Sequence, residues 1–251
     1  MKFYGDNQKL ILMSTSSSAG VIKSLRELAD PEKAAFLPKF FKTGPGEYGE
    51  GDKFLGVTVP IQRKVAKSYW RNIGKEELKI LLSSEYHEVR MTGLFMLISK
   101  FEKAKESDEK SKWVDFYLQN RQGVNNWDLV DSSAPLILGA WLWDKDRSLL
   151  YSFAESGNLW DQRISILSTF FFIRKNDFEE TLKLSEILLD HPHDLIHKAV
   201  GWMLREIGNR DYELEFQFLR QHYTNMPRTM LRYAIEKFEA ETRELFLKGN
   251  I

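Results

Sequence analysis

The stretch Asn125–Ala134 reads NNWDLVDSSA and places two carboxylates and an indole inside an otherwise apolar helical segment. Residues four apart share one face of an α-helix, so Trp127 and Asp131 point into the same space while Asp128 points elsewhere. Charge in apolar surroundings is costly unless it is paired or has a chemical use. The stretch therefore predicts a functional pair, Trp127 with Asp131. The alternative is structural: an asparagine caps the helix, both aspartates are solvated and the tryptophan packs in the core.

Composition limits the class of protein. The chain has 251 residues, of which 43% are hydrophobic, enough for a substantial core. It carries 36 basic and 36 acidic residues, so attraction to a polyanion requires segregated charge. The absence of cysteine excludes thiol catalysis, disulfides and thiolate zinc sites. No apolar run reaches the roughly 20 residues of a membrane-spanning helix, and the N-terminus lacks the pattern of a secretory signal, so we expect a cytoplasmic protein without membrane association.

Apolar residues recur with a helical period from Val21 to Leu247, and the alternation typical of strands is almost absent. Short polar breaks divide this region into about a dozen helices joined by loops of a few residues. The pattern predicts an all-α protein. We expect residues 1–20 to form a loose N-terminal arm and residues 21–251 to form a single domain.

A basic residue followed three positions later by a small or aliphatic one recurs along the chain. The basic members are Arg90, Arg163, Lys198 and Arg232, and Asp131 occupies the same register between the first two. Residues 90, 131, 163, 198 and 232 are 41, 32, 35 and 34 residues apart, a spacing that suits the two-helix units of a solenoid. Coincidence is the alternative. A true register predicts a basic row on one surface, which would attract a polyanion by releasing counterions from phosphates.

Two more tryptophans lie beside this row. Trp160 precedes Arg163 by three residues, and Trp202 follows Lys198 by four on the same helical face. Packing in the core is the more common role of a helical tryptophan. Trp202 is the better candidate for a ligand platform, because Arg205 follows one turn later.

Two motif-like stretches favour structural roles. Thr43–Lys53 contains a GxGxxG pattern, but no strand precedes it and it carries three acids, so it predicts an ordered surface loop rather than a phosphate cradle. HPHDLIH, residues 191–197, approximates a zinc-binding helix, but its general base would be Asp194 and no third ligand is evident. A helix that begins near Pro192 is the preferred interpretation, and we expect neither a metal nor a cofactor.

The motifs NWDLVDSSA, LWDQRISIL, IHKAVGWMLRE and PRTMLRYAIEK, in this order and at these distances, resemble the DNA alkylation repair glycosylases built from HEAT-like helical repeats. The resemblance extends from about Phe36 to Phe246. It implies a curved α-solenoid of HEAT-like antiparallel helix pairs. It also implies an enzyme that hydrolyses the N-glycosidic bond of N3- or N7-alkylated purines in duplex DNA.

The resemblance also implies roles for individual residues. Trp127 and Asp131 match the catalytic pair of the family, Arg163 its cleft arginine, Trp202 its second cleft tryptophan and Arg205 a DNA contact. Further DNA contacts are expected from Lys198, Arg90, Arg232, Phe40 and Tyr48.

The chain departs from the family in two places. The family often has a tyrosine near the end of the second N-terminal helix, where this chain has Phe40 and Phe41 and then the glycine-rich loop with Tyr48. Several lysines that follow the cleft arginine in the family are replaced by Phe170–Phe172. DNA affinity is therefore expected to be lower or differently distributed.

The expected chemistry needs few groups. An alkylated purine is cationic and leaves without an acid, so one carboxylate suffices, whereas glycosidases that act on neutral leaving groups pair two. Asp131 would stabilise the oxocarbenium-like sugar and orient water, with tryptophan faces near the developing cation. The expected partner is duplex DNA containing alkylated purines, bound by a monomer that associates with the nucleoid while it acts. The alternative is a non-catalytic HEAT-like module that binds nucleic acid or protein.

Overall fold

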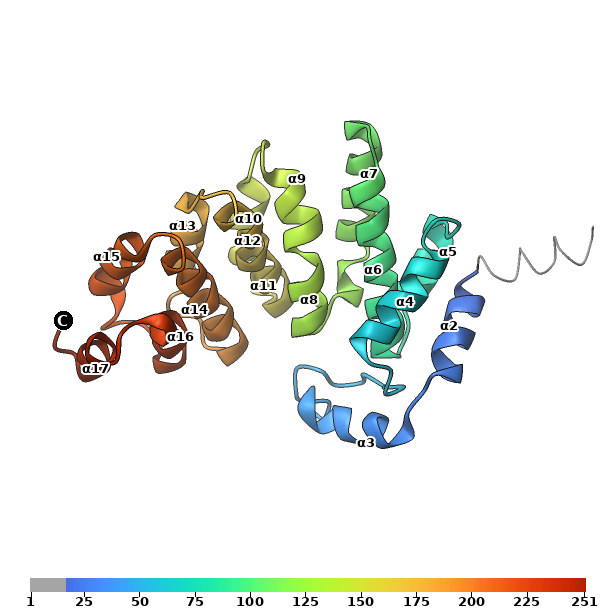
Figure 1. The fold of residues 1–251 in the computed structure, drawn as a ribbon, viewed down its shortest axis with the longest axis horizontal. Helices are drawn as coiled ribbons and strands as arrows, with labels where there is room; N and C mark the ends of the chain where they lie inside the picture. Colours follow the sequence, from blue (N-terminus) through green and yellow to red (C-terminus); the bar gives the residue numbers. More distant parts are fainter. Residues whose placement is uncertain (1–16) are drawn as a thin grey trace, which may run out of the picture. The chain divides into compact units, whose positions relative to one another are not determined.

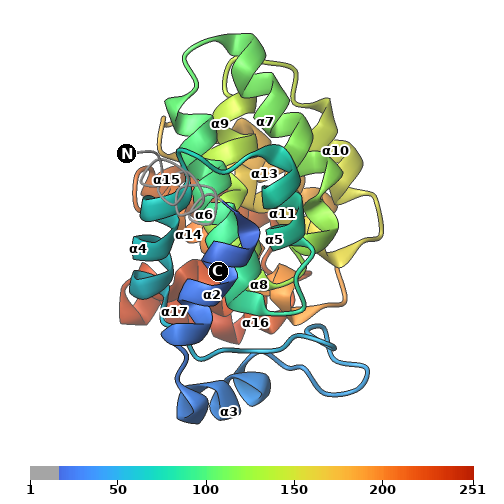
Figure 2. The same ribbon diagram turned by 90° about the vertical axis from the view of Figure 1, so that its right-hand side faces the viewer.

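The computed structural model describes residues 17–251, so most of the expected N-terminal arm lies outside the described part. In residues 17–251 every regular element is a helix, and the predicted all-α fold is confirmed (Figures 1 and 2). The extended backbone in this range forms an isolated parallel bridge between Lys53 and Tyr86. None of the described helices is both long and apolar enough to span a bilayer. The chain divides into two compact units, Met1–Leu129 and Val130–Ile251.

Unit 1 is built around one long helix, α6. The side chains of residues 87–98 of this helix are all buried, and α6 packs against α4, α5 and α7. The helices of this unit are α2 (Ser18–Glu27), α3 (Pro31–Phe40), α4 (Val59–Tyr69), α5 (Lys75–Leu82), α6 (His87–Lys103), α7 (Ser107–Gln119), the short 3-10 turn η1 (Arg121–Gly123) and the start of α8 (Trp127–Ser133). Because α2 begins at Ser18, residues 18–20 are helical and do not belong to a loose arm.

Helix α3 differs from its neighbours in unit 1. The carboxylate of Asp30 accepts hydrogen bonds from two backbone N–H groups of its first turn, and Pro31 occupies the first helical position, as favoured at a helix start. No side chain of α3 is buried, and Phe36 and Phe40 are 63% and 52% exposed. In both views α3 lies at the edge of the unit (Figures 1 and 2).

Unit 2 is built around α14, which packs against α11, α15 and α16. Gly201 permits the close approach of α16, because a Cβ at this position would lie 2.4 Å from the carbonyl oxygen of Met230. The elements of this unit are the rest of α8, η2 (Pro135–Gly139), α9 (Ala140–Leu142), α10 (Ser148–Ala154), α11 (Leu159–Ser168), α12 (Phe170–Ile173), α13 (Glu179–Ile187), α14 (Asp194–Gly208), α15 (Tyr212–His222), α16 (Arg228–Ala234), η3 (Ile235–Lys237) and α17 (Ala240–Lys248).

The segment η2 that follows α8 is a π-helical turn. The N–H of Gly139 donates to the carbonyl of Ala134, five residues earlier, at 2.9 Å. Pro135 has no N–H, so it cannot donate to the carbonyl of Asp131 as another residue at this position of an α-helix would. Single π turns of this kind are rare and occur frequently at functional sites.

Candidate active site

The first turn of α8 is fixed by a buried asparagine. Asn126 directly precedes α8 and is fully buried, and its side-chain oxygen accepts the N–H of Trp127 at 2.9 Å. The second part of the structural alternative, solvated aspartates, does not hold for Asp128. Its carboxylate accepts hydrogen bonds from the N–H of Leu129 and from the ring of His87.

The indole of Trp127 lies among aromatic rings from α3 and the residue after it. It stacks on Phe41, with ring centroids 5.5 Å apart and planes 19° from parallel, and meets Phe40 edge to face at 6.0 Å. Phe41 is buried, whereas Phe40 is largely exposed and Trp127 is half-buried. Phe40, expected as a DNA contact, is thus a neighbour of the expected catalytic tryptophan.

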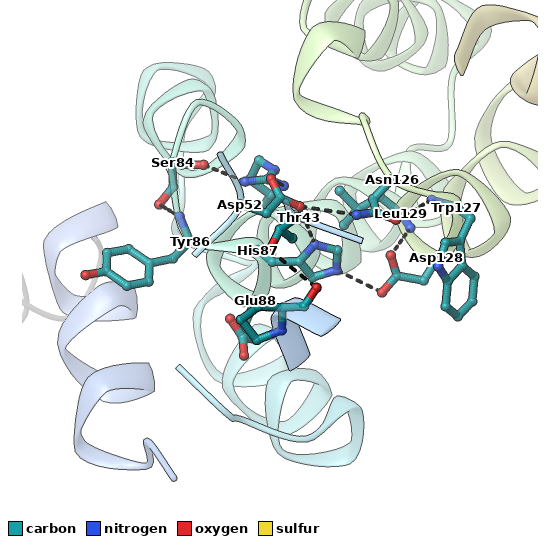
Figure 3. A network of polar contacts seen from close by, with 12 residues as sticks. Thr43, Asp52, Ser84, Tyr86, His87, Glu88, Asn126, Trp127, Asp128 and Leu129 are labelled. Atoms are coloured by element: carbon teal, nitrogen blue, oxygen red, sulfur yellow. Dashed lines mark hydrogen bonds and ion pairs between the residues drawn. The ribbon is translucent and has the colours of Figure 1, made fainter. Parts of the chain in front are cut away.

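A largely buried network of polar side chains lies next to Trp127 (Figure 3). The two ring nitrogens of His87 lie 3.1 Å from an oxygen of Asp52 and 2.9 Å from an oxygen of Asp128. Asp52 ends the glycine-rich loop, and it also accepts hydrogen bonds from Asn126 at 3.3 Å and Arg90 at 2.6 Å. The loop is therefore ordered, as predicted, but its last acid is part of the interior.

The network fixes the charge of His87. Burial alone would lower the pKa of this imidazole, but the hydrogen bonds to Asp128 and Asp52 outweigh it and raise the pKa to about 9. Burial would likewise raise the pKa of Asp52, yet the hydrogen bond from His87 and the charge of Arg90 bring that pKa below its usual value. At neutral pH the network therefore holds two buried cations between two carboxylates.

Arg90 does not belong to an exposed basic row. Its guanidinium is buried and donates to the carboxylate of Asp52 and to the carbonyl of Ser84. The prediction of a surface position for Arg90 is wrong, because Asp52, 38 residues earlier in the chain, supplies a buried partner. The cation instead neutralises the network next to Trp127.

In unit 2, Asp131 and Arg163 form a bidentate salt bridge. The guanidinium Nε and Nη2 each lie 2.8 Å from one carboxylate oxygen of Asp131, and Nη1 donates to the carbonyl of Leu195. Arg163 is buried, whereas the side chain of Asp131 is 17% exposed. The expectation that Arg163 presents charge on the surface is therefore wrong. Arg163 instead orients Asp131 by donating to both of its oxygens, the bidentate geometry typical of an arginine with a carboxylate.

Trp202 also has a carboxylate partner. Its indole N–H donates to Glu206 at 2.9 Å, and its ring lies 5.5 Å from that of Phe170. Arg205 lies 4.0 Å from the same glutamate and also pairs with Glu236. The expected DNA contact Arg205 is thus already paired with two acids.

The remaining expected contacts vary in exposure. Lys198 is half-exposed and pairs with Asp194 at 2.7 Å on the preceding turn of α14. Arg232 is exposed on α16, Tyr48 is partly exposed in the glycine-rich loop, and Trp160 is half-buried in the first turn of α11.

The three histidines of residues 191–197 make local hydrogen bonds. His193 caps α14 by accepting the N–H of Leu195, His191 bonds to Gln162, and the ring of His197 bonds to the carbonyl of His191. In the part of the chain that the structure describes, no group of three histidine or acidic side chains is placed to hold a metal ion.

Sequence reasoning missed the partner of Trp202 and the polar residues that bond to the two neighbours of Trp127. Glu206 follows Trp202 by four residues, so helical spacing alone could have identified it. His87 and Asp52 reach the first turn of α8 from distant segments, and no local pattern connects them with Trp127.

Comparison with known proteins identifies the family. The family model described as DNA alkylation repair enzyme matches residues 21–238. A solved structure, a predicted DNA alkylation repair enzyme from Enterococcus faecalis, is similar with a TM-score of 0.66 at 16% identity, covering 84% of this chain and 97% of that one, which supports the fold. No curated protein matches the sequence. The extent of the family match shows that this chain belongs to the DNA alkylation repair enzyme family.

Proposed function

We propose that the protein is a DNA glycosylase that hydrolyses the N-glycosidic bond of cationic N3- or N7-alkylated purines in duplex DNA. The observation that carries the proposal is the side chain of Asp131. It is partly exposed, and both of its oxygens are bound by a buried arginine. A carboxylate held in this way keeps its negative charge and its direction without reorganisation during the reaction, which is the basis of electrostatic catalysis.

The role of Asp131 is to stabilise positive charge on the sugar. As the bond from C1′ to the purine nitrogen breaks, its electron pair leaves with the base, which becomes neutral, and positive charge develops on the sugar. Water then adds at C1′ and loses a proton, and the carboxylate orients this water. A ring face of Trp127, four residues earlier on α8, would add cation–π stabilisation, in general about 0.5 to 2 kcal/mol. Trp202 would act in the same way.

DNA binding is assigned to fewer cations than the sequence suggested. Arg232 and Lys198 would contact phosphates, and the exposed ring of Phe40 and the partly exposed ring of Tyr48 would supply aromatic contacts. Arg205 would exchange Glu236 for a phosphate. The burial of Arg90 and Arg163 leaves only Lys198 and Arg232 of the expected basic row for phosphates, which would weaken a module that only held a polyanion.

The test is release of 7-methylguanine or 3-methyladenine from methylated duplex DNA by the purified protein. We expect release above the spontaneous rate, and we expect Asp131→Asn to slow single-turnover release by at least about tenfold, equivalent to roughly 1.4 kcal/mol of transition-state stabilisation. The dissociation constant for duplex should stay the same or fall, because removal of a negative charge does not weaken attraction to phosphates.

The matched control is Asp115→Asn, which removes the same charge from an exposed position on α7. This variant should release the base at the wild-type rate. Absence of release by the wild-type protein would refute the proposal. Equal rates for wild type and Asp131→Asn would show that the carboxylate has only a structural role.

A further inference from the structure

The network next to Trp127 contains groups to which the reaction assigns no task. We propose that His87 is a positioning residue for Trp127, because it links the glycine-rich loop to the first turn of α8 and supports the aromatic stack on which the indole lies. The inference rests on the proposed function, in which the ring of Trp127 faces the sugar.

Hydrogen bonds made by His87 and Asn126 fix the main chain around Trp127. His87 bridges an oxygen of Asp52 and an oxygen of Asp128, so it connects residue 52 with the residue that directly follows the tryptophan. The same oxygen of Asp52 accepts the amide of Asn126, whose own oxygen accepts the N–H of Trp127. The tryptophan backbone is therefore held on both sides by groups that meet at Asp52 (Figure 3).

His87 also packs against the aromatic rings that contact Trp127. The imidazole of His87 lies 4.6 Å from Phe41 and 5.3 Å from Phe54, measured between ring centroids. Phe41 in turn stacks on Trp127. Because protein interiors are closely packed, a change in the tilt of the imidazole passes to Phe41 and then to the indole.

The charge of His87 matches the two carboxylates that it bridges. Both ring nitrogens of His87 face carboxylate oxygens, so the ring fits the site only as a donor on both sides, which requires the imidazolium form. The charged groups around it are Asp52 from the loop, Asp128 from α8 and Arg90 from α6. The neighbouring Glu88 turns away and accepts the backbone N–H groups of residues 55 and 56. A neutral side chain with a single donating group would leave one of the two aspartates without the hydrogen bond from residue 87.

The variant that tests this is His87→Gln, whose amide nitrogen can reach only one of the two carboxylates. We expect single-turnover excision at saturating protein to slow by about tenfold, as expected for a misplaced catalytic group, with the dissociation constant for duplex DNA changed by less than about twofold. The matched control is Glu88→Gln, on the same buried turn of α6 but bonded away from Asp128. It should lose thermal stability and excise at the wild-type rate.

A second measurement does not depend on catalysis. The fluorescence of Trp127 is obtained as the difference between each protein and the same protein carrying Trp127→Phe. We expect His87→Gln to shift this difference spectrum and to increase its quenching by acrylamide, and Glu88→Gln to leave both unchanged. If the wild type releases no base, the proposed function fails, and the fluorescence still decides the role of His87.

Two results would overturn the inference. One is a Trp127 difference spectrum that His87→Gln leaves unchanged. The other is an excision rate that falls in proportion to thermal stability in both variants, because this would show that His87 acts only through the stability of unit 1.

Discussion

Asp52 in unit 1 and Asp131 in unit 2 are both bound by an arginine, but their surroundings differ. Asp52 has a side chain only 4% exposed and accepts hydrogen bonds from Arg90, His87 and Asn126. Asp131 is 17% exposed, and Arg163 binds both of its oxygens. Both aspartates are paired, so pairing does not distinguish them. The exposed fraction of the side chain does distinguish them. A carboxylate that is oriented by a buried arginine and remains partly exposed to solvent can be contacted by a substrate.

A third carboxylate, Glu215 in unit 2, completes the comparison. It is 1% exposed, and its Oε1 has no hydrogen-bond partner among the described residues. Burial raises its pKa to about 9, although the charge of Arg205 acts in the opposite direction. The three acids thus differ in their surroundings. Asp52 is buried and hydrogen-bonded at both oxygens, Asp131 is hydrogen-bonded and partly exposed, and Glu215 is buried with one oxygen lacking a hydrogen bond. Each state leads to a different expected response to substitution or pH.

The largest effect on stability is expected from Arg163→Met. This change leaves Asp131 without its two donors and the carbonyl of Leu195 without its partner, and loss of one member of a buried ion pair in general costs about 3 kcal/mol. The free energy of unfolding is measured by urea denaturation. Adding Asp131→Leu should recover part of the loss. A loss below about 1 kcal/mol would place this pair among exposed ion pairs.

The next effect is the pH dependence of the free energy of unfolding that arises from His87, the histidine bonded to Asp52. His87 has a folded-state pKa of about 9, above its usual value, so its contribution is present in full below about pH 6.5 and is lost as the pH rises through 9. Between pH 7 and pH 10 the free energy of unfolding should fall by about 2 kcal/mol more in wild type than in His87→Gln. Parallel curves for the two proteins would contradict the double salt bridge.

A smaller and opposite effect is expected for Glu215→Gln. Because the pKa of Glu215 is higher in the folded than in the unfolded chain, folding takes up a proton at neutral pH. The free energy of unfolding therefore falls as the pH rises from about 4.5 toward 9. The neutral amide avoids this cost. The pKa shift corresponds to at most about 5 kcal/mol at pH 8, but the buried amide also lacks a partner, and its own burial cost offsets most of this gain. Thermal unfolding at pH 8 should therefore show the variant to be more stable than wild type by about 1 kcal/mol, with the advantage shrinking as the pH falls toward 4. A destabilised variant at pH 8 would show that the carboxylate is ionised and satisfied.

The smallest effect on stability is expected for Lys198→Ala. This lysine pairs with Asp194 one turn away on α14 and is half-exposed, and such pairs contribute less than about 0.5 kcal/mol. Its effect should appear in DNA binding, where the slope of log K against log salt should decrease by about 0.9 for one lost phosphate contact. An unchanged slope would remove Lys198 from the DNA-binding surface.

The sequence predicted the helical class correctly, because the apolar period is a local property. Local spacing also predicted that Trp127 and Asp131, four positions apart, lie on one helix, as they do, while their catalytic role stays a prediction. It could not distinguish Arg90 from Arg232. Both precede a small or aliphatic residue in the same register, yet one is buried against Asp52 and the other is exposed. Exposure of a helical arginine depends on the partner that the fold brings to it, and here that partner lies in a loop outside any periodic pattern.

The π turn at Pro135–Gly139 changes the direction of every side chain that follows it in the same helical segment. Each residue of an α-helix rotates the direction by about 100°, and a π turn accommodates one more residue than the hydrogen-bond pattern of an α-helix allows. A helical wheel drawn from Asp131 therefore assigns Trp141 to the wrong face of the segment that follows. For the same reason, deletion of one residue between 135 and 139 would restore an even helix but turn the side chains of α9 by about 100° relative to those of α8, whereas substitution within the turn would leave their direction intact.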